Sequence, residues 1–141
     1  MEVEVATEVR ADPAVLWETL ADVTRWPDRI STMTSVVRLD QGPLAVGSKT
    51  SIRQPFIGTM TWLVTDLRPG TSFTWVARRP GLVVVADHEV AELDGGLLRL
   101  TLRIRQGGLL GRSSGWLLRR PMRQALTIEA EAHRAQAETT P

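Results

Sequence analysis

A change in hydrophobic period at Gly107-Gly108 constrains the fold more than any other feature of the sequence. Before it, aliphatic side chains alternate with arginine and threonine over residues 98–105, which is the two-residue period of a strand with one solvated face. After it, apolar and small residues recur at intervals of three and four, the pattern of an amphipathic helix. They are Leu110, Ser114, Leu117, Pro121, Ala125, Ile128, Ala132 and Ala135. The pattern predicts a long C-terminal helix, kinked at Pro121, that packs this face against a sheet.

The rest of the chain divides into strands and two short helices. Residues 3–9 alternate valine and threonine with mostly charged side chains, which indicates a first strand. Asp12 is a suitable N-cap for a short helix, and Trp26-Pro27 interrupts that helix and begins a second helical turn. Turn segments rich in Gly and Pro then divide residues 33–106 into five or six consecutive antiparallel strands. The order predicts an α+β fold in which the C-terminal helix covers one face of a curved sheet.

Composition limits the chemistry that the chain can perform. The 141 residues are 43% hydrophobic and 23% charged, the size and balance of one globular domain over residues 1–141. The chain has no cysteine, which excludes thiolate nucleophiles, disulfides and cysteine metal sites. Two histidines, His88 and His133, are too few for a multi-histidine centre, so we expect no metal and no cofactor. The acidic N-terminus and the short apolar runs predict a cytoplasmic protein without membrane insertion.

Several short strings, in this order of elements, resemble the START-like or SRPBCC superfamily, and within it the polyketide cyclase/dehydrase-like branch. The strings are Ala11-Asp12-Pro13, Val15-Leu16-Trp17, Asp22 to Pro27, Val46-Gly47-Ser48, Ile52 to Pro55, Trp62 to Gly70, Phe73-Thr74-Trp75 and Asp87 to Val90. The resemblance covers essentially the whole chain and implies a helix-grip fold, with six or seven strands wrapped around the C-terminal helix and a hydrophobic cavity between them. Members include aromatic polyketide cyclases, lipid and sterol carriers and plant hormone receptors, so the resemblance names no single reaction.

The cavity expected from this fold would be lined largely by apolar side chains of the central strands. Flat aromatic surfaces there suit a ring-bearing or lipid-like ligand, although the same residues are also good core. The candidate lining residues are Trp62, Phe73, Trp75, Phe56, Met60, Val84, Val90 and Leu100, together with Leu117 and Met122 of the helix. Trp17 and Trp26, in the short helices, are expected to pack at the cavity rim.

Two side chains are candidates for catalysis. His88 shares a strand face with Val84, Ala86 and Val90, so we expect it to point into the cavity, either as a structural histidine or as a ligand contact. Arg53 either reaches the cavity mouth, where it would hold a ligand oxygen, or lies on the solvated face of the sheet. A cyclase or dehydratase that uses both residues requires them in one cavity. The absence of tyrosine removes a phenolic acid from that chemistry.

The C-terminal half also carries an excess of arginine. Residues 95–128 contain seven arginines and no acidic residue, which would suit an acyl-carrier protein, an acidic membrane surface or another partner, including a second copy of the chain. Nucleic acid is not expected, because aromatic residues are not interleaved with these arginines. The string Gly111 to Gly115 matches G-x-S-x-G but opens a helix, so it is no nucleophile elbow. Glu129 and His133 are interpreted as an i, i+4 helix pair.

Three functional hypotheses follow from the sequence. The favoured one is binding of a small hydrophobic molecule, lipid-like or aromatic, between the sheet and the C-terminal helix. The alternatives are a polyketide cyclase or dehydratase that uses Arg53 and His88, and an interaction protein that uses its arginine-rich half.

Overall fold

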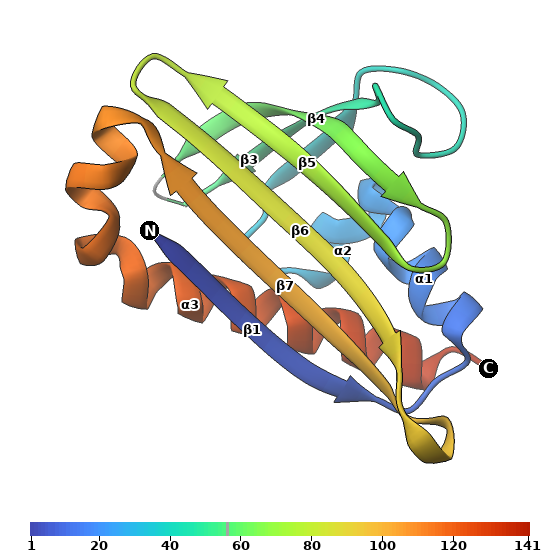
Figure 1. Cartoon of the computed structure of the whole chain (residues 1–141). Helices are drawn as coiled ribbons and strands as arrows, with labels where there is room; N and C mark the ends of the chain where they lie inside the picture. Colours follow the sequence, from blue (N-terminus) through green and yellow to red (C-terminus); the bar gives the residue numbers. More distant parts are fainter. Residues whose placement is uncertain (56) are drawn as a thin grey trace.

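The computed structural model describes residues 1–55 and 57–141, leaving aside the side chains of residues 113 and 114. In this part of the chain seven strands form one antiparallel sheet in the order β1-β7-β6-β5-β4-β3-β2 (Figure 1). The strands are β1 (Glu2–Val9), β2 (Ser35–Arg38), β3 (Lys49–Gln54), β4 (Gly58–Arg68), β5 (Ser72–Arg79), β6 (Leu82–Glu92) and β7 (Leu98–Gly107). The helices are α1 (Pro13–Ala21), α2 (Trp26–Arg29) and α3 (Gly108–Thr139), with short 3-10 turns η1 (Val23–Arg25) and η2 (Asp94–Gly96). The predicted α+β helix-grip class is confirmed.

The sheet is an antiparallel meander of β2 to β7, and the first strand of the chain, β1, adds to its β7 edge. Strands β2 to β6 each pair with the next strand along the chain, and β1 pairs with β7. The hairpin register places Phe73 of β5 opposite His88 of β6, and Trp75 opposite Ala86. Because cross-strand partners point to the same face, these four side chains all lie on the inner face of the sheet. All four are buried.

The curved sheet wraps around α3, which packs against β1, β7 and β6 (Figure 1). The short helices begin as predicted: the Asp12 side chain accepts a hydrogen bond from the Ala14 amide at 2.9 Å, which satisfies a free N–H of the first turn of α1. Helix α3 continues through Pro121, and its first turns run at an angle to the rest (Figure 1). Proline removes one backbone hydrogen bond and crowds the preceding turn, which accounts for the bend.

The inward face of α3 differs from the predicted one. Leu110, Leu117 and Ile128 are exposed. The buried residues of the helix include Met122, Leu126, Glu129, Ala130, His133 and Ala137. The prediction was wrong because it followed hydrophobicity alone, whereas the buried stripe contains a carboxyl group and an imidazole.

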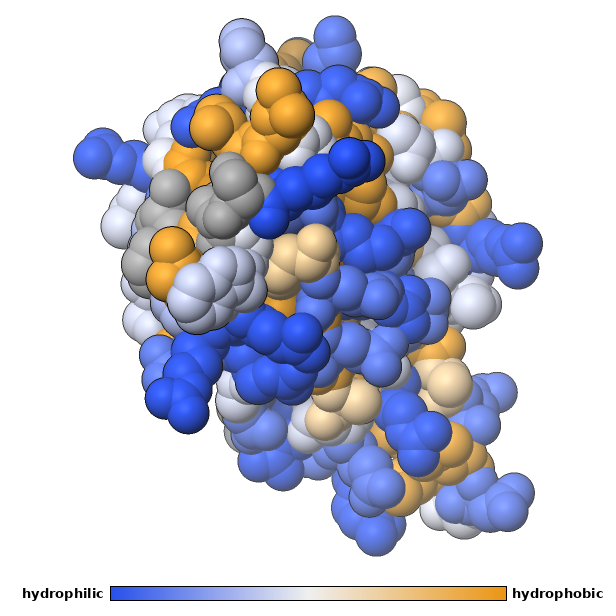
Figure 2. Space-filling view, turned by 60° about the vertical axis from the view of Figure 1, so that its left-hand side comes forward, coloured by the Kyte–Doolittle hydropathy of each residue, from blue (hydrophilic) through white to orange (hydrophobic). Residues whose placement is uncertain are grey.

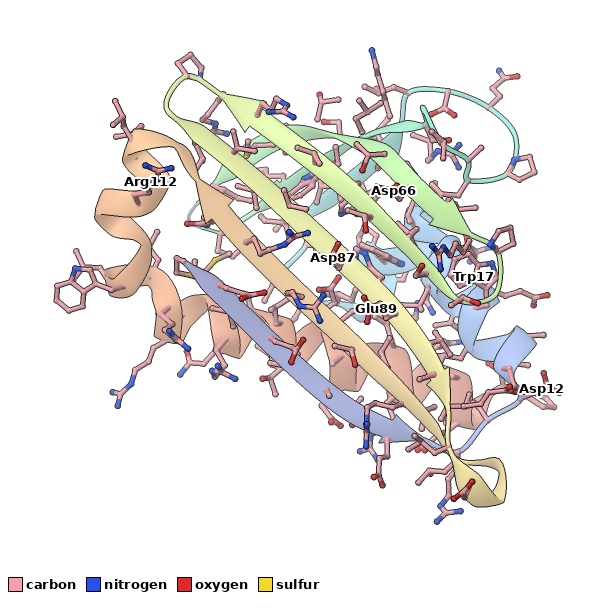
Figure 3. All side chains as sticks on the ribbon, in the orientation of Figure 1. Asp12, Trp17, Asp66, Asp87, Glu89 and Arg112 are labelled. Atoms are coloured by element: carbon pink, nitrogen blue, oxygen red, sulfur yellow. The ribbon has the colours of Figure 1, made fainter. Side chains whose placement is uncertain are left out.

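The outer face of the sheet is held by a charge network centred on Asp87 of β6, which Figure 3 labels next to Glu89. Asp87 is buried, accepts a hydrogen bond from the Thr74 hydroxyl at 2.7 Å and pairs with Arg105 at 3.1 Å. Arg103 links Asp87, at 3.4 Å, to Glu4 of β1. Hydrogen bonding to Glu4 is the main reason that the pKa of Arg103 is raised. The network ties together β1, β5, β6 and β7.

Candidate functional site

Two small cavities lie next to each other between the inner face of the sheet and α3. Their volumes are about 20 Å³ and about 30 Å³, which is room for a water molecule or two but not for a ring compound. Both are lined by Met33, Gln54, Trp62, Ile104, Leu126 and Glu129. The first cavity extends to Trp26, Trp75 and His88, and the second to Met122 and Ala125 of α3. The shared residues define one candidate site, mostly apolar with a few polar groups.

Trp26 is the centre of an aromatic cluster beside this site. Its ring centroid lies 5.3 Å from that of Trp75, 5.7 Å from that of His88 and 5.2 Å from that of His133. The side chain is fully buried, and the contacts join α2, β5, β6 and α3. Trp17 of α1 contacts the same cluster through Phe73, edge to face at 6.2 Å (Figure 3). The short helices therefore supply part of the wall of the site, with Trp26 deeper than the rim position expected for it.

His88 points inward and lines the first cavity. Its ring stacks on Phe73 at a centroid distance of 4.1 Å, and its Nδ1 lies 3.3 Å from the Phe73 carbonyl oxygen. Burial is the largest influence on its ionisation and lowers the pKa to about 4, with Glu129 opposing this shift and His133 adding to it. The ring is therefore neutral at pH 7. If Nδ1 donates to Phe73, Nε2 is left as an acceptor.

Glu129 and His133 form the polar centre of the site, and sequence reasoning missed their burial. The His133 Nε2 lies 3.8 Å from Glu129 Oε1, and the two residues are 1% and 6% exposed, respectively. Glu129 lines both cavities. A signal was present, because Met122, Leu126, Glu129 and His133 follow one another at intervals of four, three and four and so share a helix face.

Several buried polar atoms around the site have no hydrogen-bond partner within the described residues. Those on side chains that line the cavities are Trp26 Nε1, Trp62 Nε1 and Gln54 Oε1, and His133 Nε2 lies next to them. Each unsatisfied group costs free energy in a buried position, so polar atoms without partners that gather at one cavity point to a ligand or to ordered water. The site thus offers two indole N–H donors and the Gln54 oxygen as an acceptor, with the Glu129 carboxyl group beside them, in an aromatic surrounding.

The structure does not bring Arg53 and His88 together. Arg53 is exposed on the outer face of β3, while its neighbours Ile52 and Gln54 face inward. This arrangement corrects the alternative in which Arg53 reaches the cavity mouth. An inward guanidinium would have needed a buried anionic partner, and the alternation of β3 places Ile52 there instead.

The predicted lining residues have mixed positions. Trp62, Trp75 and Met122 line the cavities. Phe73, Met60, Val84, Val90 and Leu100 are buried in the core. Leu117 is 63% exposed, so its expected place in the cavity is wrong; it lies on the side of α3 that faces away from the sheet. Phe56 lies outside the described residues.

The described ranges, residues 1–55 and 57–141, hold neither a metal-ligating cluster nor a helix suited to cross a membrane. They contain no group of three or more His, Asp or Glu side chains placed to hold a metal ion. No helix in the same ranges combines the length and the apolar character needed to cross a membrane.

A long helix gripped by a curved antiparallel sheet, with an aromatic cavity between them, defines a helix-grip protein of the START-like class. The family described as "Polyketide cyclase / dehydrase and lipid transport" matches residues 1–138, and the chain belongs to this family. No curated protein sequence gives a match.

Solved structures share the fold at low sequence identity. The Zhui aromatase/cyclase of a Streptomyces species has a TM-score of 0.77 at 20% identity, over 98% of this chain and 93% of that one. A START superfamily protein of Mycobacterium smegmatis has a TM-score of 0.79 at 13% identity, over 97% of both chains. A major latex-like protein of Panax ginseng has a TM-score of 0.73 at 14% identity, also over 97% of both chains.

Proposed function

We propose that the domain binds one small hydrophobic molecule between the sheet and α3, and that the polar end of this molecule is a neutral oxygen group such as a hydroxyl. The observation that carries the proposal is the set of buried polar atoms without partners at the two cavities, Trp26 Nε1, Trp62 Nε1 and Gln54 Oε1. Family membership supports a hydrophobic ligand. The polar atoms supply what the family alone does not, which is the chemistry of the ligand's polar end.

The donors and acceptors of the site favour a hydroxyl over a carboxylate. The two indole N–H groups need an acceptor and Gln54 Oε1 needs a donor, and the Glu129 carboxyl group that lines both cavities can accept from a donor as well. A hydroxyl is both donor and acceptor. A carboxylate has acceptors only, and in this cavity it would place a second carboxylate beside that of Glu129. We therefore expect the site to discriminate against acids of similar shape.

A ligand with one or two rings must displace side chains to enter, because the cavities hold only about 20 and 30 Å³. Met33 and Met122 line the site and are unbranched, so they can change rotamer at little cost. Leu126 of α3 lines both cavities. Movement of these three side chains would join the cavities into one.

Calorimetric titration with naphthol and with naphthoate, two compounds of the same ring system, tests the proposal. We expect naphthol to bind and naphthoate to bind at least about tenfold more weakly. In Glu129→Gln the preference should shrink or reverse, because the substitution removes the negative charge and keeps the shape. The matched control is Glu131→Gln, two residues further along α3, where the glutamate is exposed and pairs with Arg134 at 2.8 Å.

Equal binding of the two compounds, or a preference that Glu129→Gln leaves unchanged, would refute the role given to the polar atoms. Failure of both compounds and of a wider panel of neutral hydrophobic molecules to bind would refute the ligand-binding function itself.

A cyclase or dehydratase is a second candidate, favoured by one observation. Glu129 and His88 line the same cavity, so two groups able to exchange a proton could act on one bound molecule. The test is incubation with a poly-keto thioester and detection of a dehydrated or cyclised product. His88→Asn should abolish product formation and leave naphthol binding within about threefold. If the unsubstituted protein binds the thioester but forms no product, the enzyme candidate is refuted and ligand binding remains as the proposed function.

A further inference from the structure

The first turns of α3 carry an exposed face that mixes apolar and basic side chains. Leu109, Arg112, Trp116 and Arg120 follow one another at intervals of three, four and four, so they share one side of the helix. Leu117 and Arg119 flank this stripe. Leu109 is 81% exposed and Trp116 75% exposed, which is unusual for side chains of this size. We call these six residues the α3 patch.

The α3 patch faces outward because the opposite side of the helix packs closely against the rest of the chain through Gly111 and Gly115. A Cβ added at Gly115 would lie 2.5 Å from the Met1 Cβ, and one added at Gly111 would lie 3.3 Å from the Gln106 carbonyl carbon and the Leu82 side chain. A side chain at Gly115 would therefore require Met1 to move, and one at Gly111 would be tightly packed against β6 and β7. Figure 3 shows Arg112 on the first turns of α3, and Figure 2, with this side turned forward, shows hydrophobic and strongly hydrophilic side chains next to one another.

The charge of the α3 patch is positive. Within the described part of the chain, no carboxylate forms an ion pair with Arg112, Arg119 or Arg120. Glu2 and Glu4 lie at the border of the patch, where they line a shallow hollow together with Arg119. There Arg123 donates to the backbone carbonyl of Glu4 at 3.0 Å and Arg103 pairs with both glutamates. The three arginines of the patch are left to face an external anion.

We propose that the α3 patch docks the protein on an anionic lipid surface. Arginines that flank exposed tryptophan and leucine on one helix are the arrangement that lies in a membrane interface, with the cations at the phosphates and the apolar side chains among the upper acyl chains. Tryptophan suits this depth because its ring is apolar and its N–H is polar. The patch carries one aromatic residue, which gives no stacking platform for nucleic acid.

Vesicle flotation tests the docking and does not depend on the ligand-binding site. Vesicles of phosphatidylcholine alone are compared with vesicles that also contain phosphatidylglycerol, at low and at high salt. We expect binding to the anionic vesicles only, and weaker binding at high salt. The combined substitution of Arg112, Arg119 and Arg120 by Gln should weaken binding about 100-fold, because each arginine near the surface contributes a factor of about five.

Two further variants separate docking from general charge and from folding. Trp116→Ala should weaken binding about tenfold or more, since it removes the largest apolar contact with the lipid. The matched control is Arg99→Gln, an exposed arginine on the outer face of β7, which should leave binding unchanged. All variants should keep the thermal midpoint of the unsubstituted protein, because the substituted residues are exposed.

Three results would overturn the proposal. They are no flotation with anionic vesicles, equal loss of binding in Arg99→Gln and in the triple variant, and binding to a DNA duplex at the same salt as tight as binding to the vesicles.

Discussion

Protonation of His88 should make the fold sensitive to acid. Burial lowers its pKa to about 4 in the folded chain, against 6.5 for an ordinary histidine, which we take for the unfolded chain. Between these two values the unfolded chain binds a proton that the folded chain does not, so stability falls as the pH falls. Well above pH 6.5 neither form is protonated, and the contribution of His88 no longer changes with pH.

The shift corresponds to a loss of about 3 kcal/mol in the free energy of unfolding when the pH drops from above 6.5 to about 4. This is a large share of the stability of a domain of this size. The physical cause is the loss of water around the ring, which stacks on Phe73 at 4.1 Å and lies among the rings of Trp26 and Trp75. The ionisable groups that face it from α3 are Glu129 and His133, and both also influence its pKa.

The assay is urea unfolding at about pH 7.5 and at about pH 4.5, for the unsubstituted protein and for His88→Asn. Asparagine places an amide N–H close to the position of Nδ1, so the hydrogen bond to the Phe73 carbonyl is retained and the proton-binding group is removed. We expect the variant to lose about 2.5 kcal/mol less than the unsubstituted protein between the two pH values, whatever its absolute stability. An identical pH dependence in the two proteins would refute the reasoning, because His88 would then not be the group that resists protonation.

Three more substitutions test other parts of the structure by chemical denaturation. Gly108→Ala should destabilise by about 2 kcal/mol or more, since Gly108 has φ +82° and an added Cβ would lie 2.5 Å from a carbonyl oxygen of the β5–β6 turn. The control is Gly107→Ala, where an added Cβ meets open space, and it should cost less than about 1 kcal/mol. Leu126→Ala should destabilise by about 2–5 kcal/mol and tighten naphthol binding, because it enlarges both cavities. Asp87→Asn should cost about 1.5–3 kcal/mol through its hydrogen bonds to cations, whereas Glu89→Gln, at an exposed position, should cost under about 1 kcal/mol. A cost for Glu89→Gln that equals that for Asp87→Asn would contradict the importance given to burial.

The order and type of the elements could be predicted because the local signals agree with the fold. The alternation over residues 98–105 matches the burial of β7, and Asp12 caps α1 as its position before Pro13 predicts. Only two states are possible for each strand residue, inward or outward, so one clear alternation settles a whole strand.

The candidate site was harder to predict because its central residues do not follow hydrophobic periodicity. Glu129 and His133 are buried on α3, while Leu117 and Ile128 are exposed, so a rule that places apolar residues inward rotates the helix incorrectly. The sequence does not predict which face of the sheet Arg53 occupies, for a related reason. The alternation of Ser51, Ile52, Arg53 and Gln54 is weak, and only the three-dimensional structure shows that Ile52 takes the inner position.

These departures from the expected pattern are themselves informative about function. A buried glutamate and a buried imidazole nitrogen without a hydrogen-bond partner lower stability, and so does a tryptophan that leaves most of its surface in water. A sequence optimised only for folding would place apolar residues at Glu129 and His133 and polar ones at Leu109 and Trp116. Helix α3 does the reverse on both sides of the bend at Pro121. Deviations of this kind are expected where a chain contacts something other than itself. The inner deviation faces the cavities and the outer one faces solvent, so we infer two separate contacts of α3, a ligand and a surface.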